Sequence, residues 1–246
     1  MTNKQEKMIC NSFGILKLKA FQKDVITDLL NGKDVLGLAR TSEGKSICFL
    51  SMIAIHPNDL LIGILPTVAL MRDLVQRCED NKIRVGCLYS GNTENTNVIE
   101  RLAHGQLQAL FVAPERLSDP HLWKAIQKNS VHTVVVDEVH CLTEWGNEFR
   151  PMYRNIGKFI KDLPASPVIA AFSATVMPDD ISYIVKSLHM KNPVIHIGKL
   201  KRSNLSLKKS FVKNDAARYA KVRKAIQKYD SKGKIVIYCT RVCDVE

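Results

Sequence analysis

Two adjacent carboxylates, Asp137 and Glu138, follow directly on a run of three valines at 134–136. Such a β-branched run predicts a strand that is buried on both faces. Carboxylates at the C-terminal end of a strand lie where open α/β sheets bind their ligands. Asp137 would hold a magnesium ion through its coordination shell, and Glu138 would orient and deprotonate an attacking water molecule. The pair therefore predicts metal-assisted hydrolysis, with an ordinary Asp-Glu turn as the alternative.

A second segment with chemical potential, ARTSEGKS, spans residues 39–46 and follows an apolar run at 35–38. It ends in the Gly-Lys-Ser of the phosphate-binding pattern GxxxxGK[ST], and Ala39 takes the place of the first glycine. Backbone N–H groups in such a loop bind phosphate oxygens. Lys45 would reach the β- and γ-phosphates, and the Ser46 hydroxyl would ligate magnesium.

Together, the two segments predict a site for ATP and Mg²⁺. Its catalytic residues would be Lys45, Asp137 and Glu138, and its metal ligands Ser46 and Asp137. The rest of the loop would add nucleotide contacts at Thr41, Ser42, Glu43 and Gly44. Glu43 is unfavourable there, because a carboxylate beside the phosphates would weaken ATP binding by repulsion unless its side chain points outward.

The elements that must position these groups alternate regularly along the chain. This alternation predicts an α/β fold with a mostly parallel sheet and helices on both faces. The predicted strands are Asp34–Ala39, Leu60–Pro66, Arg84–Tyr89, Ala109–Ala113, Thr133–Asp137, Val168–Ser173 and Val194–Gly198. The predicted helices between them are Ser46–Ile55, Val68–Asp80, Thr96–Ala103, His121–Lys128 and Asp179–His189.

Composition narrows the class of protein. The chain has 246 residues, 46% of them hydrophobic, and its apolar runs are too short to predict a transmembrane helix. The polar N-terminus does not resemble a secretory signal, and seven scattered cysteines without a CxxC pair fit reduced intracellular thiols. The net charge is +12, and residues 199–246 hold 14 basic but only four acidic side chains. Such an excess indicates a polyanion partner or, equally, a solvated basic linker.

A domain boundary is expected near residue 198. Residues 1–198 would form the first domain and 199–204 a linker. Residues 205–246 would begin a second, truncated domain, with a basic helix at Ala216–Tyr229 and a buried strand at Lys234–Cys239. One strand and one helix are too little to bury a core of their own.

Several motifs resemble the RecQ family of superfamily 2 DNA helicases, from about residue 12 to the end of the chain. DEVH at 137–140 resembles the DExH box, and Ser173-Ala174-Thr175 resembles the third helicase motif. HCLTEWGNEFRPMY at 140–153 resembles the aromatic-rich loop of the family, which is the most specific of these signals. Five further segments resemble motifs of the family: PTVALMRDLV, APERL, LKAFQ after Phe13-Gly14, KRSNL and GKIVIYC. The resemblance implies a RecA-like P-loop domain and the start of a second one.

The resemblance also implies residue roles. Gln22 and Lys19 would recognise adenine. His140, Ser173, Ala174 and Thr175 would couple the nucleotide state to the grip on DNA. Pro66, Thr67 and Arg116 would contact the DNA strand, and Trp145, Phe149 and Arg150 would sense single-stranded DNA. From the residues alone, the helical spacing of Trp145 and Phe149 would favour packing in a core, and Arg116 could equally form a structural ion pair.

The implied function is an ATP-dependent 3′–5′ DNA helicase acting in repair, recombination and replication, with single-stranded and junction DNA as its partners. A eukaryotic protein of this kind would be nuclear, and otherwise cytoplasmic. The sequence departs from the family at Ser42-Glu43, at Lys19, and in ending before the motifs that carry the arginine finger. A truncated ATP- and DNA-binding module without unwinding activity is therefore the alternative. A P-loop small-molecule kinase explains neither the SAT segment nor the tryptophan loop.

Overall fold

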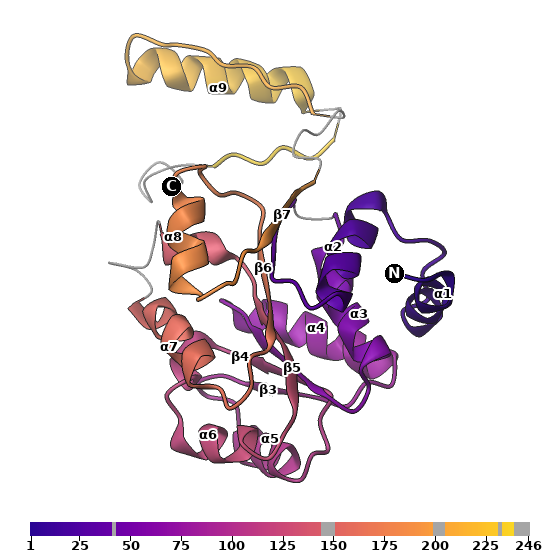
Figure 1. The fold of residues 1–246 in the computed structure, drawn as a ribbon. Helices are drawn as coiled ribbons and strands as arrows, with labels where there is room; N and C mark the ends of the chain where they lie inside the picture. Colours follow the sequence, from indigo (N-terminus) through magenta and orange to yellow (C-terminus); the bar gives the residue numbers. More distant parts are fainter. Residues whose placement is uncertain (41–42, 144–150, 199–204, 231–232, 239–246) are drawn as a thin grey trace. The chain divides into compact units, whose positions relative to one another are not determined.

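In a computed structural model, the chain forms two units, Met1–Lys201 and Arg202–Glu246, each described here by itself. The structure describes residues 1–40, 43–143, 151–198, 205–230 and 233–238 (Figure 1). The helices of these ranges never combine enough length and apolar character to cross a bilayer.

The first unit is built on a parallel sheet of seven described strands in the order β3-β4-β2-β5-β6-β1-β7. The strands are β1 (Val35–Leu38), β2 (Leu60–Ile64), β3 (Val85–Leu88), β4 (Ala109–Val112), β5 (Val131–Val136), β6 (Val168–Ser173) and β7 (Val194–Ile197). All seven predicted strands are confirmed. Fully buried parallel strands read as continuous apolar runs, which is why the sequence locates them.

Helices cover both faces of this sheet. They are α1 (Asn3–Ser12), α2 (Ala20–Leu30), α3 (Lys45–Ile55), α4 (Val68–Asp80), α5 (Asn95–Ala103), α6 (Pro120–Ile126), α7 (Arg154–Asp162) and α8 (Asp180–Ser187). The buried side chains form two clusters, one on each face of the sheet. One cluster joins the sheet to α1–α4, and the other joins it to α5–α8. The α/β architecture with helices on both faces is therefore confirmed.

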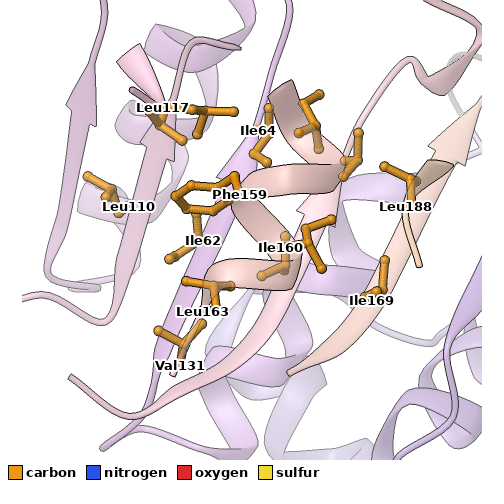
Figure 2. Packing of buried hydrophobic residues seen from close by; sticks show 14 of the residues in the cluster. Ile62, Ile64, Leu110, Leu117, Val131, Phe159, Ile160, Leu163, Ile169 and Leu188 are labelled. Atoms are coloured by element: carbon orange, nitrogen blue, oxygen red, sulfur yellow. The ribbon is translucent and has the colours of Figure 1, made fainter. Parts of the chain in front are cut away.

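The packing on the second face shows how the sheet is held (Figure 2). Phe159 and Ile160 of α7 lie over Ile62 and Ile64 of β2, whereas Leu61, the residue before Ile62, points to the opposite cluster. This alternation follows from the two-residue period of a strand. Burying a side chain of this size stabilises the fold by about 1.5–3 kcal/mol.

Three helices were not predicted from the sequence: α1, α2 and α7. Helix α1 carries a start signal, because Thr2 and Gln5 form a capping box in which the Thr2 Oγ1 accepts the Gln5 N–H at 3.2 Å. Helix α2 buries Val25, Ile26 and Leu29 against α3. Its position matters most, because its first turn carries Gln22.

The second unit contains helix α9 (Asp215–Tyr229), whose side chains are all at least partly exposed. The basic helix predicted there is confirmed. The strand predicted at Lys234–Cys239 is not present in its described part, residues 234–238. An apolar run becomes a strand only by pairing, and the described residues of this unit offer it no strand partner.

A stacked histidine pair joins the end of α3 to the start of β5. The rings of His56 and His132 lie 3.9 Å apart between centroids, at an interplanar angle of 23°. Asp59 lies 3.9 Å from His56 Nδ1, and His132 Nδ1 contacts the Thr133 Oγ1 at 2.8 Å. Burial, and then the charge of His56, lower the pKa of His132, while Asp59 opposes the shift.

We therefore expect the His pair to destabilise the protein in acid. The folded form disfavours protonated His132, so its contribution to stability is complete above the unfolded pKa of 6.5 and is lost as the pH falls below it. His132→Gln should reduce the fall in melting temperature between pH 7.5 and pH 5 by about 2 °C or more. Thermal unfolding followed by circular dichroism measures this, with the exposed His104→Gln as the control. An equal fall in wild type and His132→Gln would contradict it.

Candidate functional site

The predicted catalytic, metal-binding and coupling residues meet at the carboxyl edge of three neighbouring strands, β5, β6 and β1. Asp137 and Glu138 follow β5, Ser173 ends β6, and the phosphate loop follows β1. Ligands of open α/β sheets bind at this edge, because the loops leaving parallel strands converge there. The topology thus brings together two motifs that lie almost 100 residues apart in sequence.

The described part of the phosphate loop has the geometry that its glycine requires. Gly44 is left-handed, with φ +81°, and a Cβ atom there would lie 2.4 Å from the Gln22 Nε2. Only glycine fits such a position without strain. Helix α3 begins directly afterwards, at Lys45, so its N-terminal N–H groups point to the space where phosphates would bind. Thr41 and Ser42 lie outside the described residues.

Lys45 and Ser46 each have a hydrogen-bond partner within the protein. The Lys45 Nζ donates a hydrogen bond to the Ala39 carbonyl oxygen at 2.9 Å, within the loop itself. The Ser46 Oγ accepts one from the Arg77 guanidinium on α4, also at 2.9 Å. Arg77 was not predicted, because no local pattern indicates that an arginine 31 residues away reaches the loop.

The two carboxylates have different environments. Asp137 accepts the Glu138 N–H at 2.9 Å through its Oδ1. Burial, and then the negative charge of Glu138, raise the pKa of Asp137 to about 6, although the Lys45 and His140 charges oppose the shift. An anion held this unfavourably gains from a nearby cation. The oxygen donors of Asp137 and Ser46 therefore fit a hard cation such as Mg²⁺.

Glu138 has a strained backbone. Its φ of 50° and ψ of 49° place it in the left-handed region, which is uncommon for a residue with a Cβ. Strain of this kind costs about 1–3 kcal/mol and clusters at functional sites. The turn starts the short 3₁₀ helix Val139–Leu142 and aims the Glu138 side chain towards His140, with 3.3 Å between Oε2 and Nδ1.

His140 also connects the two helicase-like motifs. Its Nδ1 lies 2.9 Å from the Ser173 Oγ at the end of the neighbouring strand. The Ser173 hydroxyl donates to the Thr175 carbonyl oxygen at 2.8 Å and accepts the Thr175 N–H at 3.3 Å. Ala174 lies between these two residues. The predicted coupling residues thus form one continuous chain of contacts that begins at Glu138.

The residues predicted to recognise adenine lie beside the phosphate loop. The buried Gln22 accepts the Lys19 N–H at 2.8 Å and donates to the Gly44 carbonyl oxygen at 3.1 Å. Within the described part of the chain, these two bonds use one hydrogen of the amide nitrogen and one lone pair of the oxygen. Gln22 is placed to contact a nucleotide and the loop together.

A cavity of about 600 Å³ opens on the β7 side of the loop. It is lined by Lys19, Ala20, Phe21, Asp24, Arg40, Glu43, His196, Ile197 and Gly198. A triphosphate that extends from Asp137 on β5 across the loop after β1 would continue towards β7, because β7 is the next strand. Lys19 and Glu43 are the predicted nucleotide contacts that line this cavity.

The Glu43 side chain does not point outward, which was one of the two orientations that the sequence left open. Its side chain is 10% exposed, and its Oε2 lies 3.6 Å from the Lys19 Nζ and 3.4 Å from the Arg40 Nε. Two cations compensate this carboxylate. Its pairing was not predicted, because Lys19 is distant in sequence.

The predicted DNA contacts lie at the carboxyl ends of β2 and β4. Pro66 and Thr67 follow β2, and the Thr67 Oγ1 caps α4 by accepting the Leu70 N–H at 3.3 Å. Arg116 follows β4 and forms an ion pair with Asp119, which is the structural alternative considered for it. Its role in DNA binding stays a prediction. Trp145, Phe149 and Arg150 lie outside the described residues, so neither their sensor role nor core packing is tested.

Arg72 is a further cation at this edge that the sequence did not indicate. Its NH2 group donates to the Tyr89 hydroxyl at 3.0 Å, and its guanidinium lies 5.6 Å from the centre of that ring. Tyr89 follows β3, the strand beside β4. One feature of the sequence could have pointed to Arg72. In the segment PTVALMR it lies just over one helical turn beyond Thr67, the residue that caps α4.

Comparison with known proteins gives a consistent family. A sequence profile of the DEAD/DEAH box helicases matches residues 19–183. The chain is similar to the probable ATP-dependent DNA helicase RecS of Bacillus subtilis, with 28% identity over 96% of this chain and 47% of RecS. It is 32% identical to the ATP-dependent DNA helicase RecQ of Haemophilus influenzae, over 78% of this chain and 31% of that protein. The chain thus spans less than half the length of these relatives.

Among solved structures, the chain resembles the DUF1998 helicase MrfA bound to DNA and AMPPNP. The TM-score is 0.65 at 17% identity, covering 93% of this chain and 35% of MrfA. It also resembles a hypothetical ATP-dependent RNA helicase from Sulfolobus tokodaii, with a TM-score of 0.60 at 20% identity, over 79% and 56% of the two chains. At these identities the likeness supports the fold.

Proposed function

The chain belongs to the DEAD/DEAH box helicase family, and from this we propose that it is the nucleotide-hydrolysing part of an ATP-dependent DNA helicase of the RecQ type. It would couple ATP hydrolysis to 3′–5′ movement along single-stranded DNA and to unwinding of duplexes and junctions. The processes served would be DNA repair, recombination and replication. RecQ-type relatives at about 30% identity support the DNA substrate and the nucleotide.

One observation carries the proposal: His140 contacts both Glu138 and Ser173. Its Nδ1 lies 3.3 Å from the Glu138 carboxylate and 2.9 Å from the Ser173 hydroxyl. A group that prepares water for attack is thereby linked to the segment at the end of β6. A small-molecule kinase would need no such link between its carboxylates and a second motif.

The geometry supports a specific division of labour. Lys45 and the first N–H groups of α3 would bind the phosphates, and Ser46 and Asp137 would hold Mg²⁺. Bound Mg²⁺ would neutralise the phosphate charge that develops during hydrolysis. Glu138 would accept a proton from the attacking water, and His140 would orient the Glu138 carboxylate. Gln22 and Lys19 would contact the base.

DNA would lie along the carboxyl ends of β2, β4 and β3. Pro66, Thr67, Arg72 and Arg116 come from the segments after or near these strand ends. Arginines and hydroxyl groups bind phosphates and position a strand without reading its sequence. Trp145, Phe149 and Arg150 would add stacking and charge as the sensor of single-stranded DNA.

A second candidate function is an ATP- and DNA-binding module without unwinding activity. The observation that favours it is that Ser46 and Glu43 pair with cationic side chains of the protein, with which a nucleotide would compete. The Ser46 hydroxyl is engaged by Arg77, and Glu43 is engaged by Lys19 and Arg40.

Steady-state ATP hydrolysis by the 246-residue chain, with and without single-stranded DNA, tests the proposal. Glu138→Gln is the matched blank, because it keeps the shape of the side chain and removes its basicity. Turnover that DNA stimulates and that Glu138→Gln abolishes would support the motor. Bound ATP without turnover would favour the binding module instead.

His140→Ala should separate binding from coupling. The substitution removes the contacts with Glu138 and Ser173 and leaves Lys45 in place. ATP affinity should change little, whereas stimulation of hydrolysis by single-stranded DNA should fall about tenfold or more. The exposed His121→Ala serves as the control. Full stimulation in His140→Ala would exclude the coupling role.

A further inference from the structure

The phosphate loop contains a buried carboxylate that is paired inside the protein. We propose that Glu43 acts as an internal counter-ion, which holds Lys19 and Arg40 until ATP replaces it, and that it thereby sets the affinity of the chain for ATP. Glu43 would be a positioning residue, since it acts through the two cations. The inference rests on the proposed function, and it concerns how readily the site is filled.

The burial of Glu43 requires its partners. The residue is 8% exposed, and an isolated carboxylate at such a position would be strongly unfavourable. Lys19 approaches its Oε2 to 3.6 Å from the turn before α2. Arg40 approaches the same oxygen from the other end of the loop, with both Nε and NH2 at 3.4 Å. One oxygen thus draws together two cations that come from different elements.

These cations lie where a nucleotide must enter. Lys19, Arg40 and Glu43 all line the cavity of about 600 Å³ on the β7 side of the loop. A nucleotide bound there brings negative phosphates into the loop next to Glu43. The phosphates would attract Lys19 and Arg40 and repel the carboxylate. Binding therefore exchanges one anion for another at the same two cations.

The neighbouring groups of the loop are also turned towards the protein. Lys45 donates to Ala39, and Ser46 accepts from Arg77. Both groups can still meet a ligand beside these contacts, because the Lys45 ammonium has two further hydrogens and the Ser46 oxygen has a second lone pair. Glu43 differs from both, because its charge has the same sign as the incoming ligand. It is therefore the group whose removal should favour binding.

The test is ATP binding by Glu43→Gln, measured with the fluorescent analogue mant-ATP and Mg²⁺. Glutamine keeps the size of the side chain and removes its charge. We expect binding about tenfold tighter than in wild type, which corresponds to about 1.4 kcal/mol. Glu100→Gln makes the same change in net charge at an exposed position of helix α5, which lies beside β3 at the opposite edge of the sheet. This variant should bind mant-ATP like wild type.

Two further measurements separate the exchange from a general loosening of the loop. In a Lys19→Met/Arg40→Met background, the gain from Glu43→Gln should shrink to about twofold, because the coupling partners are gone. In steady-state hydrolysis, Glu43→Gln should lower KM in proportion to its gain in mant-ATP affinity. A gain that persists in full without the two cations would overturn the exchange in favour of direct repulsion.

The outcomes also distinguish this inference from the proposed function. If wild type binds mant-ATP and loses it with Lys45→Ala, but Glu43→Gln binds equally or more weakly, only the inference fails. If wild type and Glu43→Gln both fail to bind, the nucleotide site itself is wrong and both proposals fall. Binding by Glu43→Gln alone would support both.

Discussion

Replacing Lys45 with alanine is expected to weaken ATP binding by about 100-fold or more. The Lys45 ammonium lies at the first position of α3, beside the space for the phosphates. Hydrogen bonds to charged groups contribute about 1.5–3 kcal/mol each, and a phosphate would receive at least two from this group. Each 1.4 kcal/mol corresponds to a tenfold change in affinity, so the loss should exceed every other single substitution in the loop.

Equilibrium titration with mant-ATP measures the loss, and circular dichroism checks that the fold is kept. Ala39 is buried, so the loss of the bond to its carbonyl oxygen should lower the melting temperature by about 2–6 °C without unfolding the chain at room temperature. Lys158→Ala removes an exposed lysine from α7, on the opposite face of the sheet from α3, and is the control. Unchanged ATP affinity in Lys45→Ala would mean that the site is assigned wrongly.

Asp137→Asn should abolish most hydrolysis and yet stabilise the metal-free protein. The loss of a metal-binding charge should reduce turnover by about 100-fold or more. The gain in stability follows from the pKa of about 6 in the folded chain, against 3.8 for the ordinary carboxyl group. The folded form binds a proton more tightly than the unfolded form. The contribution of Asp137 to the free energy of unfolding is therefore complete below pH 3.8, and it is lost as the pH rises towards 6.

At pH 7.5 the wild type carries this full penalty, and the neutral asparagine avoids it. At 1.36 kcal/mol per unit of pKa, partial exposure reduces the difference to about 1–2 kcal/mol. For a chain of this size, the melting temperature should rise by about 2–6 °C. The rise should shrink at pH 5, where wild-type Asp137 is largely protonated. Differential scanning calorimetry without Mg²⁺ and nucleotide checks this, with the exposed Asp162→Asn as the control. A gain equal at both pH values would refute the electrostatic cause.

The strands and the catalytic pair could be predicted because their signals are local. Val134, Val135 and Val136 are buried on both faces and end in Asp137 and Glu138 without an intervening residue. Helix α4 begins and ends at the predicted residues, since a proline and a capping threonine precede it and its apolar positions repeat with helical spacing. The apolar run at 234–239 carried the same local signal as these strands. Its described residues, 234–238, form no strand, because strand pairing depends on distant parts of the chain.

The contacts that modify the site could not be predicted, because each joins distant parts of the chain. Arg77 reaches Ser46 from another helix, and Arg72 reaches Tyr89 from across a loop. Glu43 was expected to repel phosphates, but its pairing with Lys19 depends on where α2 begins. Residue types show which chemistry is available, whereas tertiary packing determines which charges are already paired.

The common direction of the strands divides the connections of the first unit into two sets. Those at the carboxyl edge hold the chemistry, and those at the amino edge, such as residues 163–167, do not. A fluorophore attached through Ser166→Cys, in the connection between α7 and β6, would therefore report on motion of the first unit without contacting the nucleotide. Among the cysteines that the structure describes, burial raises the pKa of Cys48 and of Cys78 to about 12 and keeps their reactive thiolates scarce, which favours labelling at the introduced cysteine. Among the described cysteines, Cys10 and Cys87 are partly exposed and would be replaced first.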